Sequence, residues 1–589
     1  MTRHARLRVP IPASVLLAVT LLAGRAHAAC ALEKLLELPV TMTDMQPLVP
    51  ARLNGRDALF LVDSGAVFST ISAAKSAEFG LKPGPAPFGY TMSGVGGAMK
   101  TTFVSAKSFS AGDRNLTTSF VVGGSDIGHD AAGLIGQNIL GVADVEYDLA
   151  HGAVRVMRPH DCVSRHLAYW AEGPNYSVVE IEAAPFRKTI GVAAVNGVRI
   201  RVEFDSGAQS STLTTAGARR IGLDPHAPGV VSAGVSGGVG RRLVQTWIAP
   251  VDSFKIGDED IRHTRLRLTD TDIGDIDMLL GADFFLSHRI YVANDQRKVY
   301  FTYNGGPVFN LEVAPIAQGG TALPAAAQGS AAEPSDAAAF ARRGTAFASR
   351  RQYEKAIADL TRAVDLAPTD PSYLFERARA YQGNNQPFLA MADLDKSLAL
   401  KPDDIPALAT RAAFHLAGHD KPHALSDLAA ANGLAPRQAD VHLELATLYE
   451  RANEPASALG QLDLWIAAHP EDGRQAVALN ERCWTRALWN QALDLAAADC
   501  TAALKRDPTL LPARNSRGLV RLRQGDADGA IADFNADLAA RPDSAWSLYG
   551  RGLARLKKGQ SAEGKADLAA ATALRPGLDA EARAHGLAP

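Results

Sequence analysis

The stretch NGRDALFLVDSGA at residues 54–66 decides the fold, because it returns as NGVRIRVEFDSGA at residues 196–208. Each copy opens on Asn-Gly, a strong hairpin-turn signal, and runs through β-forming residues to Asp-Ser-Gly-Ala. A single Asp-Ser-Gly is ordinary turn chemistry and would be interpreted as an Asx turn that ends a strand. Two copies, each after an apolar strand and separated by a constant shift in numbering (196 − 54 = 205 − 63), indicate an internal duplication.

Further signals repeat along the same two regions. Gly222 follows Gly80 at the same shift, and the apolar-apolar-Gly segment at 134–136 returns at 279–281, where the shift is larger by three. A Gly-rich hairpin lies between them in each copy. The first hairpin comprises Ser93, Gly94, Val95, Gly96 and Gly97, and the second comprises Gly234, Val235, Ser236, Gly237 and Gly238. The sequence therefore predicts two β-rich lobes, at residues 29–165 and 166–312.

The two Asp-Ser-Gly turns supply a pair of carboxyls, Asp63 and Asp205. Two carboxyls that share one proton can take a proton from water and give one to a carbonyl oxygen, because like charges a few ångströms apart do not both ionise. We expect Ser64 and Ser206 to hydrogen-bond across the lobes. Glycines at the third position allow the two turns to approach closely, and the Gly-rich hairpins suit flaps that close over an extended peptide.

An apolar strand, Asp-Ser-Gly-Ala, a Ser-Gly-Val-Gly-Gly hairpin and an apolar-apolar-Gly segment together resemble the retropepsin-like aspartic peptidases. The resemblance covers roughly residues 40–305. It implies an all-β, two-lobed fold with the site between the lobes and no cofactor. It implies that Asp63 and Asp205 are catalytic, with Ser64, Gly65, Ser206 and Gly207 as their immediate support. Both halves lie in one chain, so the expected active unit is a monomer.

The second copy departs from the first at several positions. Glu203 lies two residues before Asp205, on the same face of the strand, where the first copy has Leu61. A third carboxyl there would raise the pKa values of the pair or disturb it. Gln209 replaces Val67, and extra small residues at 232–240 give the second flap a different reach. These differences bear on catalysis rather than on the fold.

A 34-residue repeat follows a linker rich in Ala, Pro and Gly at residues 313–336. Its prolines stand at Pro368, Pro402, Pro436, Pro470, Pro508, Pro542 and Pro576, so the interval is constant except between Pro470 and Pro508, where it is longer by four. We expect these four extra residues in the loop at 470–476. Small residues recur where paired helices would cross. The period is typical of tetratricopeptide repeats, which predicts an all-α superhelix at residues 337–589 that binds a protein partner.

The amino-terminal segment and the cysteines point to export. Arg3, Arg6 and Arg8 precede an apolar run and an Ala-His-Ala site, which predicts a signal peptide at residues 1–28; a retained membrane anchor is the alternative. An even number of cysteines in an exported chain favours disulfides, and pairing within domains gives Cys30–Cys162 and Cys483–Cys500. Free buried thiols are the alternative for the second pair. A periplasmic or secreted bacterial protein is expected.

Charge, hydrophobic runs and metal-ligand spacing give no sign of a further partner or cofactor. With 61 basic and 63 acidic residues, the formal charge of −2 gives no sign of nucleic acid as a partner. Beyond the signal peptide no apolar run is long enough to span a bilayer, so the mature chain should have no membrane span. The cysteines lack metal-ligand spacing and the 15 histidines form no HExxH motif, so we expect no metal.

The function that these features favour is an exported aspartic endopeptidase whose repeat array recruits a peptide or protein substrate. One alternative is an inactive scaffold that binds extended peptides without cutting them. A glycosidase also uses two carboxyls, but it gives no reason for paired Asp-Ser-Gly turns with flaps.

Overall fold

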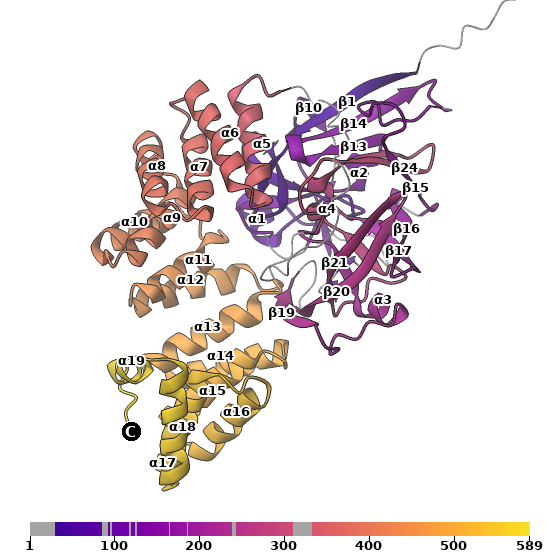
Figure 1. Cartoon of the computed structure of the whole chain (residues 1–589). Coiled ribbons are helices and arrows are strands. Elements are labelled where there is room, and N and C mark those ends of the chain that lie inside the picture. The colour runs from indigo at the N-terminus through magenta and orange to yellow at the C-terminus, as the bar shows by residue number, and fades with distance from the viewer. Residues whose placement is uncertain are drawn as a thin grey trace, which may run out of the picture.

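The computed structural model contains an all-β part followed by an all-α part (Figure 1). It describes residues 30–84, 92–94, 97–99, 101–116, 119–123, 127–163, 165–184, 187–237, 243–309 and 333–589. The predicted signal peptide, most of the predicted linker, and the flap residues Val95, Gly96 and Gly238 lie outside these residues.

The first lobe is built on a sheet in the order β10-β9-β3-β4-β12-β5-β11-β8, with β2 paired to β3. Its strands are β2 (Thr41–Thr43), β3 (Gln46–Leu53), β4 (Arg56–Val62), β5 (Thr70–Ile71), β8 (Thr102–Ser105), β9 (Phe109–Ala111), β10 (Arg114–Leu116), β11 (Ser119–Val122) and β12 (Ala131–Ile135). Two short helices, α1 (Ala73–Glu78) and α2 (Gln137–Leu140), follow β5 and β12. The hairpin of β6 (Met92–Gly94) and β7 (Gly97–Met99) forms its own small sheet.

The second lobe repeats this plan in the order β16-β17-β22-β18-β21-β20-β19. Its elements are β16 (Ile190–Val195), β17 (Val198–Phe204), β18 (Thr212–Thr214), α3 (Thr215–Arg220), β19 (Val231–Ser236), β20 (Val244–Ile256), β21 (Glu259–Thr269), β22 (Met278–Leu280) and α4 (Ala282–Ser287). In both lobes the strand that ends in Asp-Ser-Gly pairs in parallel with the strand of the apolar-apolar-Gly segment, β4 with β12 and β17 with β22. The predicted duplication is thus present in the topology.

A further sheet joins the lobes, in the order β1-β14-β13-β23-β24-β15. It consists of β1 (Ala31–Pro39), β13 (Asp144–Asp148), β14 (Ala153–His160), β15 (Ser177–Glu180), β23 (His288–Ala293) and β24 (Lys298–Tyr303). Its central pair, β13 with β23, is antiparallel and takes one strand from each lobe. One hydrophobic core runs through both lobes and includes Phe60, Val62, Phe204 and Phe284. The lobes therefore share a core as well as a sheet.

Residues 333–589, all of which the structure describes, form seven helix pairs and a terminal helix. The pairs are α5 (Ala337–Ser349) with α6 (Tyr353–Leu366), α7 (Pro371–Gly383) with α8 (Pro387–Leu400), α9 (Ile405–Ala417) with α10 (Lys421–Leu434), α11 (Val441–Arg451) with α12 (Pro455–Ala468), α13 (Gln475–Leu488) with α14 (Leu493–Arg506), α15 (Leu511–Gln524) with α16 (Ala527–Ala540), and α17 (Ala545–Lys557) with α18 (Ser561–Leu574). The last helix is α19 (Leu578–Ala584). Fully buried alanines such as Ala378 and Ala390 lie where the paired helices cross, as the repeat pattern predicts.

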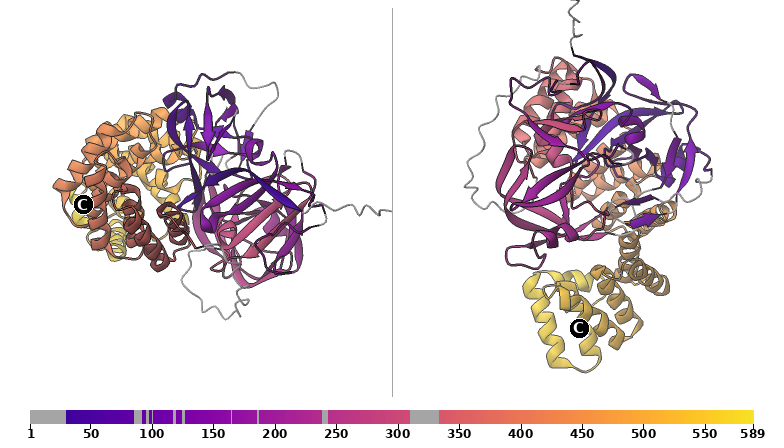
Figure 2. Two further views of the ribbon diagram at one scale, coloured as in Figure 1. Left: turned by 90° about the horizontal axis from the view of Figure 1, so that it is seen from above. Right: turned by 90° about the vertical axis from the view of Figure 1, so that its right-hand side faces the viewer.

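The array begins against the β-domain and extends away from it (Figures 1 and 2). Helix α5 packs on β2 and on the short 3-10 helix η1 (Leu149–His151), and Ala346 of α5 belongs to the core of the lobes. In the second pair, Arg379 Nη2 lies 2.8 Å from Asp44 Oδ1 in the turn between β2 and β3. The first repeats are thereby fixed to the first lobe by apolar contacts and an ion pair.

Both predicted disulfides are present, Cys30–Cys162 in the first lobe and Cys483–Cys500 between α13 and α14. The first one links the start of β1 to the segment after β14, and the second one fastens the fifth helix pair. In the described residues, no helix combines the length and the apolar character that a bilayer span requires.

Candidate active site

The two lobes place Asp63 and Asp205 side by side at the ends of β4 and β17. Each strand end is held by the partner strand of its own lobe. The Asp63 N–H donates to the Ile135 carbonyl at 3.0 Å, and the Asp205 N–H donates to the Leu280 carbonyl at 2.9 Å. The two aspartates remain partly exposed, although each strand that precedes them ends in fully buried residues. Parallel pairing thus delivers both aspartates to the contact between the lobes.

Ser64 and Ser206 exchange hydrogen bonds across that contact, as the sequence predicts. The Ser64 hydroxyl donates to the Phe204 carbonyl at 2.8 Å and accepts from the Ser206 N–H at 2.8 Å. The Ser206 hydroxyl donates to the Val62 carbonyl at 2.9 Å and accepts from the Ser64 N–H at 3.1 Å. Both side chains are buried, so these four bonds exchange no partner with water and fix the two turns to each other.

The glycines of the two turns face the opposite carboxyl. A Cβ atom on Gly65 would lie 2.6 Å from Asp205 Cγ, and one on Gly207 would lie 2.3 Å from Asp63 Cγ. Any side chain at either position would therefore separate the two aspartates. Each carboxylate is held from its own turn, since Asp63 Oδ1 accepts the Gly65 N–H at 2.9 Å and Asp205 Oδ1 accepts the Gly207 N–H at 3.0 Å.

The electrostatics favour one shared proton. Burial raises the pKa of Asp63 well above its usual range, and the nearby charge of Asp205 raises it further. Burial also raises the pKa of Asp205, against the hydrogen bonds that it accepts from Asp63 and from its own turn. Since buried like charges this close do not both ionise, one of the two carboxyls keeps its proton. The pair can therefore present an acid and a base at the same time.

Two supporting residues of the first lobe were not found from the sequence. The buried Gln137 amide donates to the Ser64 carbonyl at 2.7 Å. Tyr147 of β13 is buried beside Ser64 and the aspartates, and this burial raises the pKa of its phenol. When the two apolar-apolar-Gly segments are aligned, Ala282 and Val292 of the second lobe correspond to Gln137 and Tyr147. The duplication therefore gave no signal for either residue.

A second pair of contacts is common to both lobes. Asn138 Oδ1 accepts from the N–H and hydroxyl of Ser69, at 2.7 and 2.8 Å. Asp283 Oδ1 accepts from the same groups of Ser211, at 2.8 and 2.6 Å. The segments that contain them could be aligned from the sequence, but the contacts could not, because they join residues far apart in the chain. They brace the loop behind each aspartate.

Glu203, the third carboxyl near the pair, is compensated by a cation. Its two oxygens accept from Lys188 Nζ at 2.8 and 3.0 Å. Burial raises the pKa of Glu203 and Lys188 lowers it, while Lys188 also lowers the pKa of Asp205. At the shift that relates the two Asp-Ser-Gly turns, Lys188 and Glu203 correspond to Gln46 and Leu61. The ion pair therefore replaces a neutral amide and a buried leucine of the first lobe.

The two predicted flaps differ in their pairing. Ser93, Gly94 and Gly97 lie in β6 and β7, which pair only with each other among the described strands. Gly234, Val235 and Ser236 lie in β19, which pairs with β20 of the main sheet, and Gly237 follows it. Val235 is 50% exposed. Both glycine-rich segments are hairpins, as predicted, but only the second continues a lobe sheet in the described residues.

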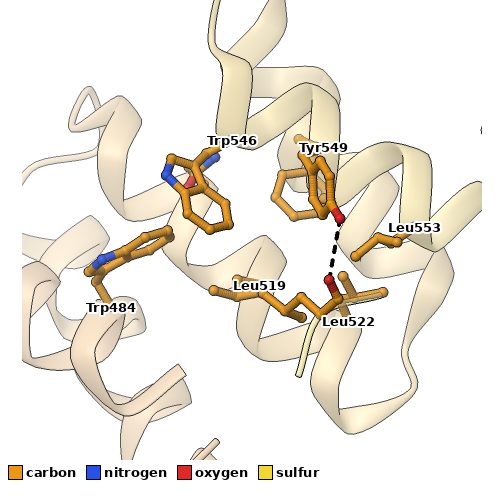
Figure 3. A pocket seen from close by; sticks show the side chains of 10 residues that line it. Trp484, Leu519, Leu522, Trp546, Tyr549 and Leu553 are labelled. Atoms are coloured by element: carbon orange, nitrogen blue, oxygen red, sulfur yellow. Dashed lines mark hydrogen bonds between the residues drawn. The ribbon is translucent and has the colours of Figure 1, made fainter. Parts of the chain in front are cut away.

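The array carries an apolar pocket in its last repeats (Figure 3). Its walls are aromatic and aliphatic side chains, with Trp484 and Trp546 in edge-to-face contact at 5.3 Å. The residues that line it are Trp484, Asn515, Leu519, Leu522, Phe534, Trp546, Tyr549, Gly550, Leu553 and Leu587. The Tyr549 hydroxyl donates to the Leu587 carbonyl at 3.3 Å, so the end of the chain closes one side of the pocket.

Comparison with known families agrees with both halves of this architecture. A model of the family described as "Aspartyl protease" matches residues 49–139 and 192–284, one segment in each lobe. A tetratricopeptide repeat model matches residues 337–370. No curated protein matches the chain. The family match in two segments is an independent sign of the duplication.

Several solved structures are similar to part of the chain. A tetratricopeptide repeat protein from Parabacteroides merdae is 15% identical with a TM-score of 0.34, over 42% of this chain and 96% of that one. The pilF protein of Pseudomonas aeruginosa is 17% identical with a TM-score of 0.31, over 36% and 94%. The Cut9 and Hcn1 complex is 16% identical with a TM-score of 0.32, over 42% of this chain, which spans about half of that one, 48%.

Proposed function

We propose that this chain, a retropepsin-like aspartyl-protease domain followed by a tetratricopeptide repeat array, is an aspartic endopeptidase with Asp63 and Asp205 as its catalytic pair. The observation that carries the proposal is the pair itself, two carboxyls at the ends of equivalent strands, tied together by four buried hydrogen bonds. Burial and mutual repulsion leave one proton on two carboxyls, the state that general acid–base hydrolysis of a peptide needs.

In the proposed reaction a water molecule lies between the carboxyls and the substrate carbonyl. The ionised carboxylate removes a proton from the water, whose oxygen attacks the carbonyl carbon, while the protonated carboxyl donates to the carbonyl oxygen. The carboxyl that accepted the proton from water then passes it to the amide nitrogen as the C–N bond breaks, and a hydroxyl of the tetrahedral intermediate returns a proton to the other carboxylate. Ser64 and Ser206 take no part in proton transfer, because both hydroxyls already donate to backbone carbonyls. They keep the two carboxyls in one geometry.

Cleavage of a mixed peptide library from pH 3 to 8 tests the proposal. Wild-type protein should cut, while Asp63→Asn and Asp205→Asn should each abolish cutting, since one Asp and one Asn cannot provide both the acid and the base. Asp57→Asn is the matched control. Asp57 lies in β4, the strand that ends just before Asp63, but its side chain is 92% exposed. If folded wild type binds peptides and leaves them intact, the chain is a peptide-binding scaffold instead.

The array is proposed to recruit a protein substrate or partner. Its first helix shares the core of the lobes, so a protein held by later repeats would stay at a set distance from the aspartates. Trp546→Ala should weaken cleavage of a natural protein substrate and leave the cleavage of short peptides unchanged, because Trp546 lines the array pocket and belongs to α17, at the end of the array away from the lobes (Figure 1). Equal loss for peptides and proteins would argue against recruitment.

Export and a monomeric state complete the proposal. Two disulfides are typical of proteins from oxidising compartments, which supports a periplasmic or secreted location in a bacterium. Protein recovered from the envelope or the medium should begin at Ala29, and amino-terminal sequencing will show whether it does. Since both aspartates come from one chain, ultracentrifugation of the active protein should give the mass of a monomer.

A further inference from the structure

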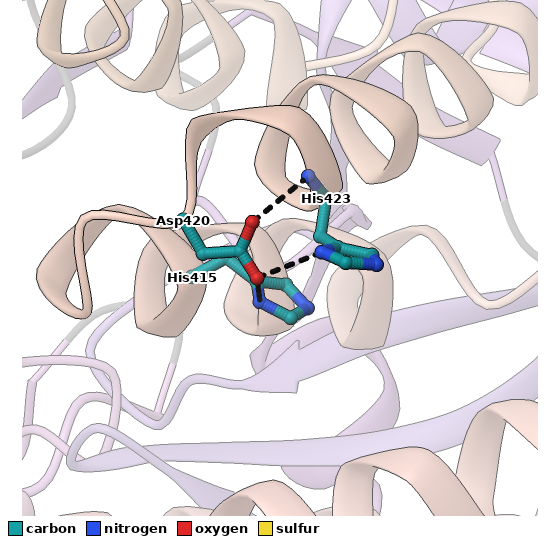
Figure 4. A group of neighbouring side chains, drawn as sticks. All are labelled: His415, Asp420 and His423. Atoms are coloured by element: carbon teal, nitrogen blue, oxygen red, sulfur yellow. Dashed lines mark hydrogen bonds and ion pairs between the residues drawn. The ribbon is translucent and has the colours of Figure 1, made fainter.

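The turn between α9 and α10 brings two imidazoles and a carboxylate together (Figure 4). Asp420 Oδ2 lies 2.7 Å from His423 Nδ1 and 3.3 Å from His415 Nδ1. The three potential ligand atoms all lie within 4.8 Å of one another. Among the described residues, no other three His, Cys, Asp or Glu side chains bring their ligand atoms this close together. The group lies in the array rather than beside the aspartate pair.

The size of this triangle suits a small divalent ion. Zinc binds imidazole nitrogen and carboxylate oxygen at about 2.0–2.2 Å, so tetrahedral ligands lie about 3.4 Å apart. The two distances that involve Asp420 are already at or below this separation, and a small rotation of either ring would shorten the third. A carboxylate between the two rings also offsets the positive charge of the ion.

The surroundings favour one ring orientation and leave room for water. His415 Nε2 lies 4.0 Å from Asp427 Oδ2, on the side away from Asp420. Arg411 holds Asp427 through two bonds of 2.8 and 2.7 Å, so this carboxylate has a fixed position behind the ring. Metal-binding histidines commonly point their second nitrogen at such an outer carboxylate. His423 is 73% exposed, which leaves the remaining coordination positions open to solvent.

We propose that His415, Asp420 and His423 form a binding site for a divalent transition-metal ion, with zinc as the expected occupant and water as the fourth ligand. The ion would join the end of α9 to the first turn of α10 and so stiffen the third helix pair. The site has no role in the proposed peptide hydrolysis and does not depend on it. Sequence motifs did not predict it, because the ligands have the spacing His-x4-Asp-x2-His across a turn.

Metal-free protein carrying a tag without histidine, dialysed against zinc chloride, provides the test. Bound zinc is measured by mass spectrometry of the metal, and affinity by calorimetry. We expect one tight zinc ion per chain in the wild type. His415→Ala, His423→Ala and Asp420→Asn should each weaken binding by at least about tenfold, by loss of a ligand. Asparagine caps a helix as well as aspartate does, so Asp420→Asn removes the ligand while α10 keeps its cap.

The matched control is His419→Asn. His419 lies in the same turn, is exposed, and has φ = 59°, a conformation that asparagine tolerates. This variant should bind zinc like the wild type. Cobalt(II) in place of zinc should give a visible spectrum of nitrogen and oxygen ligation that the Asp420→Asn variant lacks. The proposal fails if wild type takes up no zinc, if His419→Asn loses as much as His415→Ala, or if Asp420→Asn loses nothing.

Discussion

The two lobes keep the same contacts at the aspartates and differ in the residues around them. Each lobe contributes an Asp, a Ser and a Gly. The serine bonds are reciprocated across the contact at 2.8 to 3.1 Å, and each aspartate accepts the glycine N–H of its own turn. Behind each turn, Ser69 with Asn138 and Ser211 with Asp283 form equivalent pairs. The contacts that fix the geometry of the aspartate pair are nearly the same in the two lobes.

Beyond those contacts the symmetry is lost. Gln137 donates to the Ser64 carbonyl and Tyr147 is buried beside Ser64, both in the first lobe only. Lys188 and Glu203 lie beside Asp205 only, and Lys188 lowers the pKa of Asp205. A symmetric pair has no reason to hold its proton on one side, whereas a cation near one carboxyl favours the charged form of that carboxyl. The asymmetry therefore favours ionised Asp205 and a proton on Asp63.

The difference teaches what a single chain permits. When both halves of such a site come from identical chains, every substitution changes both sides at once. Here one side can change its charge while the other stays apolar. The following predictions test, in order of decreasing effect, the shared contacts, the unequal surroundings and the unequal titration.

Gly65→Ala and Gly207→Ala should have the largest effect, and it should be similar in the two lobes. The added Cβ would lie 2.6 Å from Asp205 Cγ or 2.3 Å from Asp63 Cγ. Both distances are too short for a contact between carbon atoms, so the two turns must move apart. Displacements of about 1 Å at a reacting pair cost about 100-fold in rate. We expect each variant to lose at least that much peptide cleavage, measured as kcat/KM.

Gly460→Ala in α12 is the control for these variants. A Cβ there meets no atom within 4 Å, and alanine is favoured in a helix interior by about 0.5–1 kcal/mol. It should raise the melting temperature slightly and leave cleavage unchanged. If Gly65→Ala cleaves as well as the wild type, the aspartates do not act at their observed separation.

Lys188→Gln and Glu203→Leu, alone and together, convert the second lobe to the residues of the first. Removal of Lys188 alone leaves a buried carboxyl without its partner. We expect a loss of about 1–3 kcal/mol, below the range for fully buried pairs, because the Lys188 side chain is 33% exposed. The double variant should recover most of this loss, since a leucine suits the site, as Leu61 shows. Calorimetric unfolding of all four proteins gives the coupling.

The same variants sharpen the comparison of the carboxyls. Lys188→Gln alone removes the cation that lowers the pKa of Asp205 and leaves Glu203 in place, so the acidic limb of its cleavage profile should move to higher pH. If the double variant lost as much stability as the two single variants together, Lys188 and Glu203 would not be coupled. An unchanged acidic limb would show that Lys188 does not set the titration of the pair.

Much of the fold could be predicted because the sequence contains it twice. The constant shift between the two copies located both aspartates, both serines and both glycines, and the 34-residue period located the helix pairs. Residues that act in one lobe only, Gln137 and Tyr147, have no counterpart and gave no signal. Long-range packing could not be predicted either, because nothing in the sequence of α5 indicated that Ala346 joins the core of the lobes.

The longer interval between Pro470 and Pro508 shows that the position of the four extra residues was predicted only in part. We predicted the four extra residues in the loop near Pro470. The connection at 469–474 has six residues, against four at 367–370, and so takes two of them. Helix α13 is one residue longer than α9, and the connection at 489–492 is one residue longer than that at 418–420. These two elements take the other half of the insertion, and the 34-residue interval resumes after Pro508.

The smallest predicted effect is a difference in melting temperature that depends on pH. The folded state raises the pKa of Asp63 well above its usual range, mainly through burial, while an unfolded aspartate titrates near about 3.9. As pH rises above that value, the unfolded chain gains stability by ionising and the folded chain does not, so the wild type is penalised progressively. Asp63→Asn escapes this penalty because the amide does not titrate.

Its melting temperature should therefore equal that of the wild type near pH 3.5 and exceed it by pH 7, by about 2–4 °C for each kcal/mol of penalty removed. Asp205→Asn should show a smaller rise, because Lys188 lowers the pKa of Asp205 and so reduces the penalty that its charge carries. Calorimetric scans of the three proteins at four pH values would measure both differences. Equal rises for the two variants would mean that the surroundings of the pair, however unequal in structure, leave its proton evenly shared. A rise that appears only below pH 4 would reverse the sign of the linkage and exclude raised carboxyl pKa values.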